Sequence, residues 1–386
     1  MPPAPASKFQ RLARTHALFA AGDAAMVVAL ADSFFFDVDP NGARSKVLAF
    51  LLVSFAPFLL VAPFVGPVID RVRGGRRMVV QGVALARIPV QVLMIVFADG
   101  FILFPLVFVA LVLQKTYAVS RAALVPSVVR DDAELVEANS KLGTIAGVVG
   151  TLAVVPAGLL QITIGASATF AYGALVFTAA FAASLQLARE QPPQVIPATA
   201  TVAGEPAAFS APTLTLAAAA MMVLRGAAGF MLFHLAFWFR TRDNGDVLLG
   251  LAVASASMGT FLANSVGRAV RARLREERML TMALVLPAAA ALGATLVGGP
   301  AAGIAVAVAV NFAAAIGRLA FDSLVQRDGP AINRGQAFAR FETAFQLTWV
   351  VAAVLPVLIE MPGRVGLLLV GLVCASAVFN YRLGLR

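Results

Sequence analysis

Charge is scarce in this sequence. Only 13% of its 386 residues are charged, whereas 60% are hydrophobic and the mean hydropathy is +0.88. In a soluble domain about a quarter of the residues are charged. A chain of this composition lacks the polar side chains needed to cover a surface in water, so we expect an integral membrane protein.

Cysteine and histidine are scarcer still. Cys374 is the single cysteine, which excludes an intrachain disulfide, and His16 and His234 are the two histidines. Zinc sites are built mostly from clusters of these two residue types, and the sequence contains neither a cysteine pair nor a His-Glu-x-x-His motif. We therefore expect no metal, no cofactor and no enzymatic activity.

Long apolar runs are abundant instead. A helix needs about 20 apolar residues to cross a bilayer, and the sequence contains twelve runs of that kind. They cover residues 15–36, 47–69, 78–98, 101–123, 142–164, 168–187, 213–239, 247–266, 279–297, 301–324, 337–359 and 365–381. The sequence thus predicts an all-α membrane protein with twelve transmembrane helices. Two six-helix halves, residues 1–188 and 213–386, are joined by a linker at 189–212 that is rich in Pro, Ala and Thr.

Basic residues give the chain a net charge of +10. Proteins that bind nucleic acid gather such residues on one face or helix. Here they lie at alternate ends of the apolar runs, which is the positive-inside pattern. We therefore expect no nucleic-acid partner. We expect a monomer surrounded by lipids in the plasma (inner) membrane, with both termini in the cytoplasm.

The two halves carry traces of an internal repeat. A shift of 197 residues places Arg121 on Arg318, and the same shift places Arg76 on Arg273. One shift that fits two separate loops favours duplication over coincidence. Parallel repeats related by an axis along the membrane normal are one architecture of secondary transporters.

One loop motif resembles a known family. Gly66-Pro-Val-Ile-Asp70-Arg71, followed by two glycines and Arg76-Arg77, is similar to the signature between helices 2 and 3 of the major facilitator superfamily. The turn after Arg71 is two residues longer than in that signature. The span count, the linker and the repeat extend the resemblance over the whole chain.

Further motifs resemble one branch of that superfamily. Gly22-Asp23 and Leu124-Val-Pro126 are similar to motifs of the bacterial drug- and siderophore-exporter branch, and Phe341-Glu342 to those of an uncharacterised actinobacterial group within it. Val155 stands before Pro156 where the antiporters have Gly.

The resemblance implies a gate on the cytoplasmic side. Asp70 is expected to cap the start of the eleventh helix and Arg71 to pair with acids near Asp131, so that these contacts form only when the inner side is closed. The full predicted set is Gly66, Asp70, Arg71, Arg76, Arg77, Asp131, Arg318, Asp322, Arg340 and Glu342. In the alternative interpretation the basic loop only sets the topology, and the other charges stay in water.

Charged residues inside the spans are costly and commonly functional. Asp23, Arg87 and Arg225 fall near the middle of their spans, where transporters of this kind bind substrate. Asp23 is a candidate for taking up and releasing a proton during transport. The alternative is a static Asp23–Arg225 pair that holds the first and seventh spans together.

Other polar or aromatic side chains inside the spans are candidates for lining a cavity. They are Gln91, Gln114, Tyr117, Asn311, Gln346 and Trp349. Each of them could instead make a hydrogen bond between helices. His234, among aromatic residues near a span end, is expected in the aromatic belt at the membrane interface.

Together these features predict a secondary active transporter that works by alternating access. The expected activity is proton-coupled export of a small amphipathic molecule, and the two arginines favour a partly anionic one. A flippase for a lipid or a lipid-linked precursor is the first alternative. The second is a membrane anchor or sensor that keeps the fold without transport.

Overall fold

The structure is a computed structural model that describes residues 6–30, 75–98, 102–129, 131, 134–188, 212–240, 242, 244–328 and 334–384. Every regular element within these residues is a helix. The predicted span at 47–69 lies outside the described residues, and so do Gly66, Asp70 and Arg71 of the loop motif. The described helices fall into two compact units.

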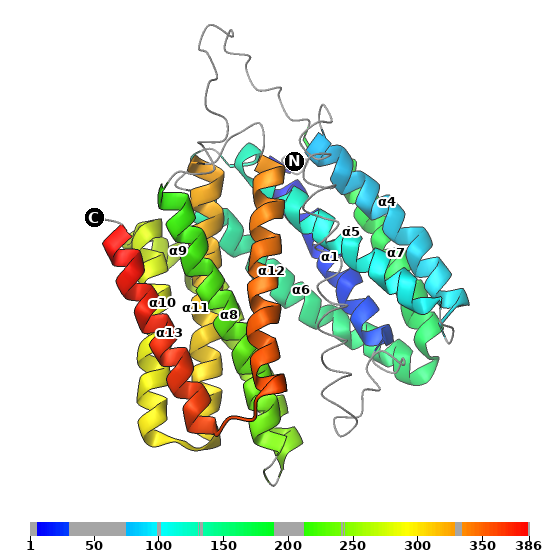
Figure 1. Ribbon diagram of the computed structural model, residues 1–386. Helices are drawn as coiled ribbons and strands as arrows, with labels where there is room; N and C mark the ends of the chain where they lie inside the picture. The colour runs from blue at the N-terminus through cyan, green and yellow to red at the C-terminus, as the bar shows by residue number, and fades with distance from the viewer. Residues whose placement is uncertain are drawn as a thin grey trace, which may run out of the picture. The chain divides into compact units, whose positions relative to one another are not determined.

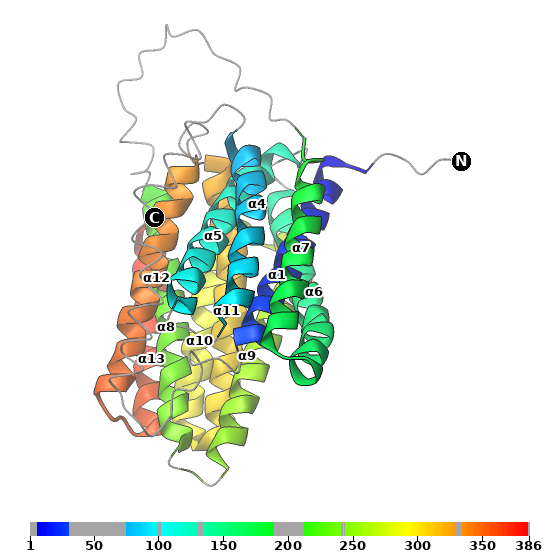
Figure 2. The same ribbon diagram turned by 90° about the vertical axis from the view of Figure 1, so that its right-hand side faces the viewer.

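The first unit contains five α-helices and one short 3-10 helix. They are α1 (Lys8–Leu30), α4 (Gly75–Val96), α5 (Leu103–Leu124), η2 (Val125–Ser127), α6 (Leu135–Thr163) and α7 (Ala166–Ser184). Helix α1 packs against α6 and α7, and α4 packs against α5 and α7 (Figure 2). Gly165 makes the tight turn between α6 and α7 with a φ of 113°, a backbone conformation that favours glycine.

The second unit contains six α-helices. They are α8 (Pro212–Arg240), α9 (Gly245–Arg273), α10 (Glu276–Val297), α11 (Gly299–Asp328), α12 (Arg334–Leu358, which belongs to this unit from Phe341 onward) and α13 (Gly363–Gly384). Helix α11 packs against α8, α9 and α10, while α13 packs against α8 and α10 (Figure 1).

The packing of the first unit recurs in the second. The contacts of α4 with α5 and α7 correspond to those of α10 with α11 and α13, and the α1–α7 contact corresponds to α8–α13. A shift of 197 residues carries the start of α7 at Ala166 onto the start of α13 at Gly363. The repeated packing supports the internal repeat inferred from the basic residues.

Several helices are longer than the apolar runs that predicted them. Helix α1 begins at Lys8, α6 begins at Leu135 inside a segment expected to be a charged connection, and α9 continues to Arg273 beyond the expected end at 266. The predicted boundaries were wrong here because hydropathy detects only the part of a helix that prefers lipid. Charged residues in an exposed terminal turn remain compatible with a helix.

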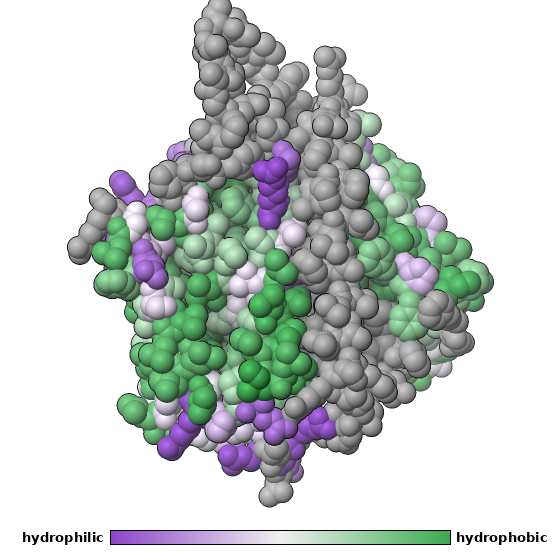
Figure 3. Space-filling model, in the orientation of Figure 1, coloured by the Kyte–Doolittle hydropathy of each residue, from purple (hydrophilic) through white to green (hydrophobic). Residues whose placement is uncertain are grey.

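The outer surfaces of the helices are apolar. Large side chains such as Leu152, Ile162 and Leu296 are 64%, 79% and 83% exposed. In Figure 3, apolar side chains gather along the helices of the second unit and hydrophilic ones lie towards the helix ends. Ten of the described helices are long and apolar enough to cross a membrane. The chain is therefore a multi-pass membrane protein.

Candidate substrate cavity and buried charges

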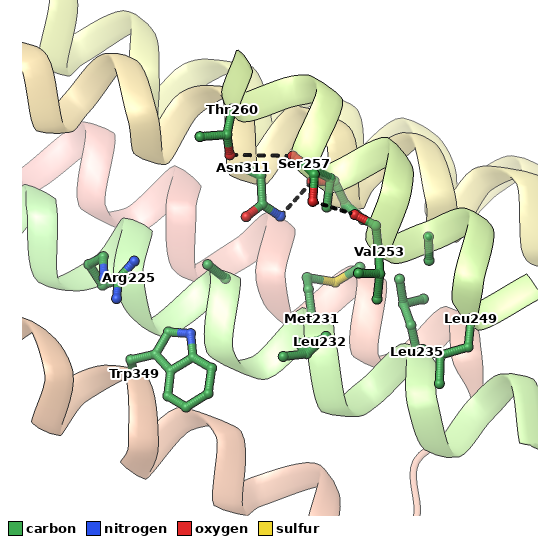
Figure 4. Close-up of a pocket in the computed structure, with 14 residues that line it drawn as sticks. Arg225, Met231, Leu232, Leu235, Leu249, Val253, Ser257, Thr260, Asn311 and Trp349 are labelled. Carbon is green, nitrogen blue, oxygen red and sulfur yellow. Dashed lines mark hydrogen bonds between the residues drawn. The ribbon is translucent and has the colours of Figure 1, made fainter. Parts of the chain in front are cut away.

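The second unit contains a partly open cavity of about 220 Å³ between α8, α9, α11 and α12. Most of its lining is apolar, and one charged side chain, Arg225, contributes to it (Figure 4). Asn311 and Trp349 line the same cavity. Three side chains that the sequence singled out separately, on three different helices, are thus brought together at one site.

Arg225 projects from α8 into this cavity, on the same side as the indole of Trp349 (Figure 4). Among the described residues it has neither a hydrogen bond nor an ion-pair partner. Helix α8 lies close to α12 at Gly229, where an added Cβ would collide with the backbone of Trp349. Glycine at this position therefore sets the distance between Trp349 and α8.

The polar side chains on α9 and α11 use their donors within their own helices. Asn311 Nδ2 donates to Ala307 O at 2.9 Å, and Ser257 Oγ donates to Val253 O at 2.9 Å. Thr260 donates one turn back in the same way, at 3.3 Å. The carbonyl oxygen of Asn311 and both hydroxyl oxygens therefore remain as acceptors towards the cavity. Ser257 and Thr260 were missed from the sequence because hydroxyl residues that bond their own helix are common in transmembrane segments.

An ion pair lies inside the first unit. Arg87 Nη2 on α4 lies 2.5 Å from Asp23 Oδ1 on α1, and the two side chains are 1% and 20% exposed. Arg87 also donates to Ala110 O of α5 at 2.7 Å, and its guanidinium lies 4.3 Å from the centre of the Phe177 ring on α7. One arginine thus joins four helices. The partner of Asp23 within this unit is Arg87. The alternative pair of Asp23 with Arg225 stays a prediction.

Two of the predicted cavity residues are buried within this first unit. Tyr117 shares a hydrogen bond of 3.0 Å with His16 and stacks on Phe19 with ring centres 3.7 Å apart. Gln91 is fully buried, and its amide lies 3.3 Å from the position that a Cβ on Gly173 would occupy. Gln114 and Gln346 are each partly buried. The cavity of the second unit is lined by none of these residues, so their role in a cavity stays a prediction.

The charged residues at the helix ends of the second unit form two groups, and the first contains the predicted gate residues Arg318, Asp322 and Glu342. In the first group Arg318 lies 2.8 Å from Asp322 on its own helix and 2.6 Å from Glu342 on α12. The guanidinium also lies 5.9 Å from the centre of the Phe345 ring. Arg318 therefore links α11 to α12. Arg340 is exposed.

The second group centres on a residue that the sequence reasoning missed. Glu276, the first residue of α10, is 2% exposed and lies 2.9 Å from Arg271 and 3.3 Å from Arg327. Arg327 also contacts Glu277 at 3.2 Å and Asp328 at 2.7 Å. The signal available in the sequence was an acidic pair opening a helix directly after an arginine-rich helix end.

Two predicted gate arginines at the start of α4 contact the ends of other helices. Arg76 donates to Ala123 O near the end of α5 at 3.5 Å, and Arg77 donates to Leu185 O after α7 at 3.0 Å. Cations near such carbonyl groups stabilise a helix C-terminus. Asp131 is exposed.

His234 differs from the sequence expectation. It is 2% exposed, stacks between Phe230 and Trp238, and contacts Gly363 O at 3.2 Å through Nε2. The assignment to an interfacial belt was wrong because α13 covers this face of α8. A single sequence does not show which face of a helix is covered.

The helix packing and the apolar surface together define a helical membrane protein with charged residues inside it. A profile of the Major Facilitator Superfamily matches residues 15–353, so the chain belongs to that superfamily. Its fold is that of a secondary transporter. Members of the superfamily carry small-molecule substrates and are usually monomeric.

Two mycobacterial relatives illustrate its similarity to known sequences. An uncharacterized protein of Mycobacterium leprae (strain TN) is 28% identical over 406 residues, covering 93% of this chain and 69% of the relative. An uncharacterized protein of Mycobacterium tuberculosis (strain CDC 1551 / Oshkosh) is 35% identical over 139 residues, covering 32% of this chain and 25% of the relative.

Solved structures share the fold at low sequence identity. A bacterial homologue of the iron transporter ferroportin in an outward-facing state is 16% identical, covers 98% of both chains and has a TM-score of 0.69. A variant of the E. coli fucose:proton symporter is 12% identical, with 97% of this chain and 98% of that chain covered and a TM-score of 0.74. These likenesses establish the fold alone.

Proposed function

We propose that this protein works by alternating access and exports a small amphipathic molecule in exchange for protons, with Asp23 as the coupling group. The observation that carries the proposal is the ion pair in the first unit, in which Asp23 is 20% exposed while Arg87 is 1% exposed. A proton can reach the carboxylate, whereas the arginine stays in place. Resemblance to the exporter branch supports the direction of transport.

Protonation of Asp23 would remove the charge that neutralises Arg87. Arg87 would still be held by Ala110 O and by the ring of Phe177, on α5 and α7. The two protonation states of Asp23 therefore differ in how strongly α1 is attached to the other helices. A bound proton shifts a conformational equilibrium only if it stabilises one conformation more than the other. A change in the attachment of α1 would provide such a difference.

The remaining parts of the proposal concern the membrane and the gate. We place the protein in the plasma (inner) membrane with both termini in the cytoplasm, because the basic residues lie at alternate ends of the spans. The cytoplasmic gate would combine the loop motif around Asp70 with the Arg318–Glu342 bridge between α11 and α12. A membrane anchor would have no use for a cavity with an arginine inside it.

The experiment begins with the purified protein. A thermal-shift screen of drugs, siderophores and lipid head groups across several pH values selects a ligand, because a ligand that binds the folded state raises its apparent stability. The selected ligand is then loaded into vesicles that contain the protein and a pH-sensitive dye. We expect its efflux to move protons in the opposite direction.

Asp23→Asn is the decisive variant. We expect it to retain ligand binding and to lose substrate-driven proton movement. Lys141→Gln is the matched control, since Lys141 forms an exposed ion pair with Glu137 at 2.7 Å. Unchanged proton flux in the Asp23→Asn vesicles would exclude Asp23 as the coupling group.

One observation favours a lipid flippase as the second candidate. Leu232 and Val253 line the cavity and are 40% and 46% exposed, so the cavity has an apolar rim. An acyl chain could lie along such a rim. Vesicles carrying a fluorescent phospholipid in the inner leaflet test this directly, because only a flippase would expose the label to a quencher added outside.

A further inference from the structure

The cavity of the second unit carries a positive charge and no negative one among its lining residues. The cavity is lined by fourteen residues, among which Arg225 is the only charged one. We propose that this cavity is an anion site that binds the carboxylate of a small aromatic acid through Arg225. The inference rests on the proposed transport function and narrows its substrate class.

Arg225 is available for an anion because the acid that acts on it is already bonded to another arginine. Glu342 is the acid whose charge acts on Arg225, but it is bonded to Arg318 at 2.6 Å. Arg225 is half-buried and, unlike Arg87, has no ion-pair partner among the described residues. Its planar fork of donors matches a carboxylate, which it can bind through two parallel hydrogen bonds.

The size and the walls of the cavity restrict the body of the ligand. A volume of about 220 Å³ corresponds to about seven water molecules at roughly 30 Å³ each, which is enough for one aromatic ring with a short substituent. Trp349 offers its indole beside Arg225 (Figure 4), and stacked or edge-on aromatic pairs gain energy beyond their buried area. Met231 and Leu235 form part of the apolar wall.

Hydrogen-bond acceptors lie on the other helices around the cavity. They belong to Asn311 on α11 and to Ser257 and Thr260 on α9. Each of these side chains already donates a hydrogen bond to a backbone carbonyl of its own helix. The oxygens of these side chains are suited to a ligand hydroxyl that donates a hydrogen bond. The arrangement therefore favours an acid with a hydroxyl group remote from the carboxylate.

The test uses defined probes and a local reporter. The chain contains two tryptophans, so a Trp238→Phe background leaves Trp349 in the cavity wall as the single indole. The probes are benzoate, 4-hydroxybenzoate and 4-hydroxycinnamate, each compared with its primary amide. Binding to the full-length protein in detergent is followed by Trp349 fluorescence and, in the unmodified chain, by thermal shift.

We expect the acids to bind at least about tenfold more tightly than their amides, the ratio typical of a hydrogen bond to a charged group. Arg225→Gln should abolish this preference, and Arg225→Lys should retain part of it. Arg364→Gln is the matched control, because Arg364 lies outside the cavity and contacts Val297 O; the preference should remain intact. Asn311→Leu should reduce the advantage of the hydroxylated acids.

Equal binding of acids and amides by the unmodified chain would overturn the proposal, as would a preference that survives in Arg225→Gln. If Arg225→Gln does not fold, the anion site is still tested by two measurements. They are the binding preference of Arg225→Lys and the ratio of acid to amide affinity in the unmodified chain. Binding of the acids without transport in vesicles would contradict the transport function while leaving the anion site standing. Transport of a neutral ligand by a protein that does not bind the acids would contradict the anion site alone.

Discussion

Replacing Asp23 by Asn leaves the guanidinium of Arg87, which is 1% exposed, without its anionic partner. Removing one partner of a buried ion pair costs about 3–5 kcal/mol, because the other charge stays buried and uncompensated. Asp23 itself is 20% exposed, so its carboxylate is not fully enclosed by the protein. We therefore expect a loss near the lower end, about 3 kcal/mol of the free energy of unfolding.

The converse replacement should be milder. Arg87→Gln leaves a carboxylate that is 20% exposed rather than fully buried, and we expect a loss of about 1–2 kcal/mol. In the double variant Asp23→Asn/Arg87→Gln no charge remains uncompensated. It should therefore be more stable than Asp23→Asn alone, with a coupling energy of about 2 kcal/mol between the two positions.

Unfolding in mixed micelles with increasing SDS, followed by tryptophan fluorescence, measures these free energies in all four proteins. The control is Lys141→Gln, which breaks a pair whose side chains are 54% and 25% exposed; it should cost less than about 0.5 kcal/mol. An Asp23→Asn loss no larger than the control, or a double variant that is simply additive, would refute the reasoning.

Three further predictions concern packing and burial. Gly22→Ala would place a Cβ 2.7 Å from the ring of Phe177, the ring that also contacts the arginine of the ion pair, and should lower the free energy of unfolding by about 1–3 kcal/mol in the same assay. Glu276→Gln weakens two contacts to arginines at a side chain that is 2% exposed and should lower it by about 2 kcal/mol. Cys374 is free and buried, so a maleimide should label it only after denaturation.

Two matched replacements serve as controls for these predictions. Gly82→Ala introduces a Cβ with no neighbour within 4 Å and should be neutral or slightly stabilising, because alanine is the better helix former. Glu277→Gln affects a side chain that is 27% exposed. It should lower the free energy of unfolding by less than Glu276→Gln does. Equal losses within either pair, or rapid labelling of Cys374 in the folded protein, would contradict the packing described.

The general architecture followed from composition and pattern. Apolar runs located every described α-helix. The basic residues at the ends of these runs revealed a repeat that the packing of α4, α7, α10 and α13 supports. The ends of α1, α6 and α9 were misjudged because the charged turns at helix termini look like loops on a hydropathy scale. A helix can continue beyond the residues that prefer lipid, so hydropathy alone does not locate its ends.

The candidate site was anticipated only in part. Arg225, Asn311 and Trp349 stood out in the sequence because charged, amide and indole groups are unusual inside spans. Their convergence could not be inferred, because it depends on how three helices far apart in the chain pack together. Glu276 was missed because a glutamate at a helix start is ordinarily solvated.

The sequence by itself determined that this chain resides in a membrane as a bundle of helices with a few charges inside it. That conclusion needs only the balance of apolar and polar residues and the length of each run. The tertiary structure decided what the charges mean: Arg87 is neutralised by Asp23, whereas Arg225 faces a cavity. The reason is that the energy of a buried charge depends on what lies within a few ångströms of it, and those neighbours come from other helices.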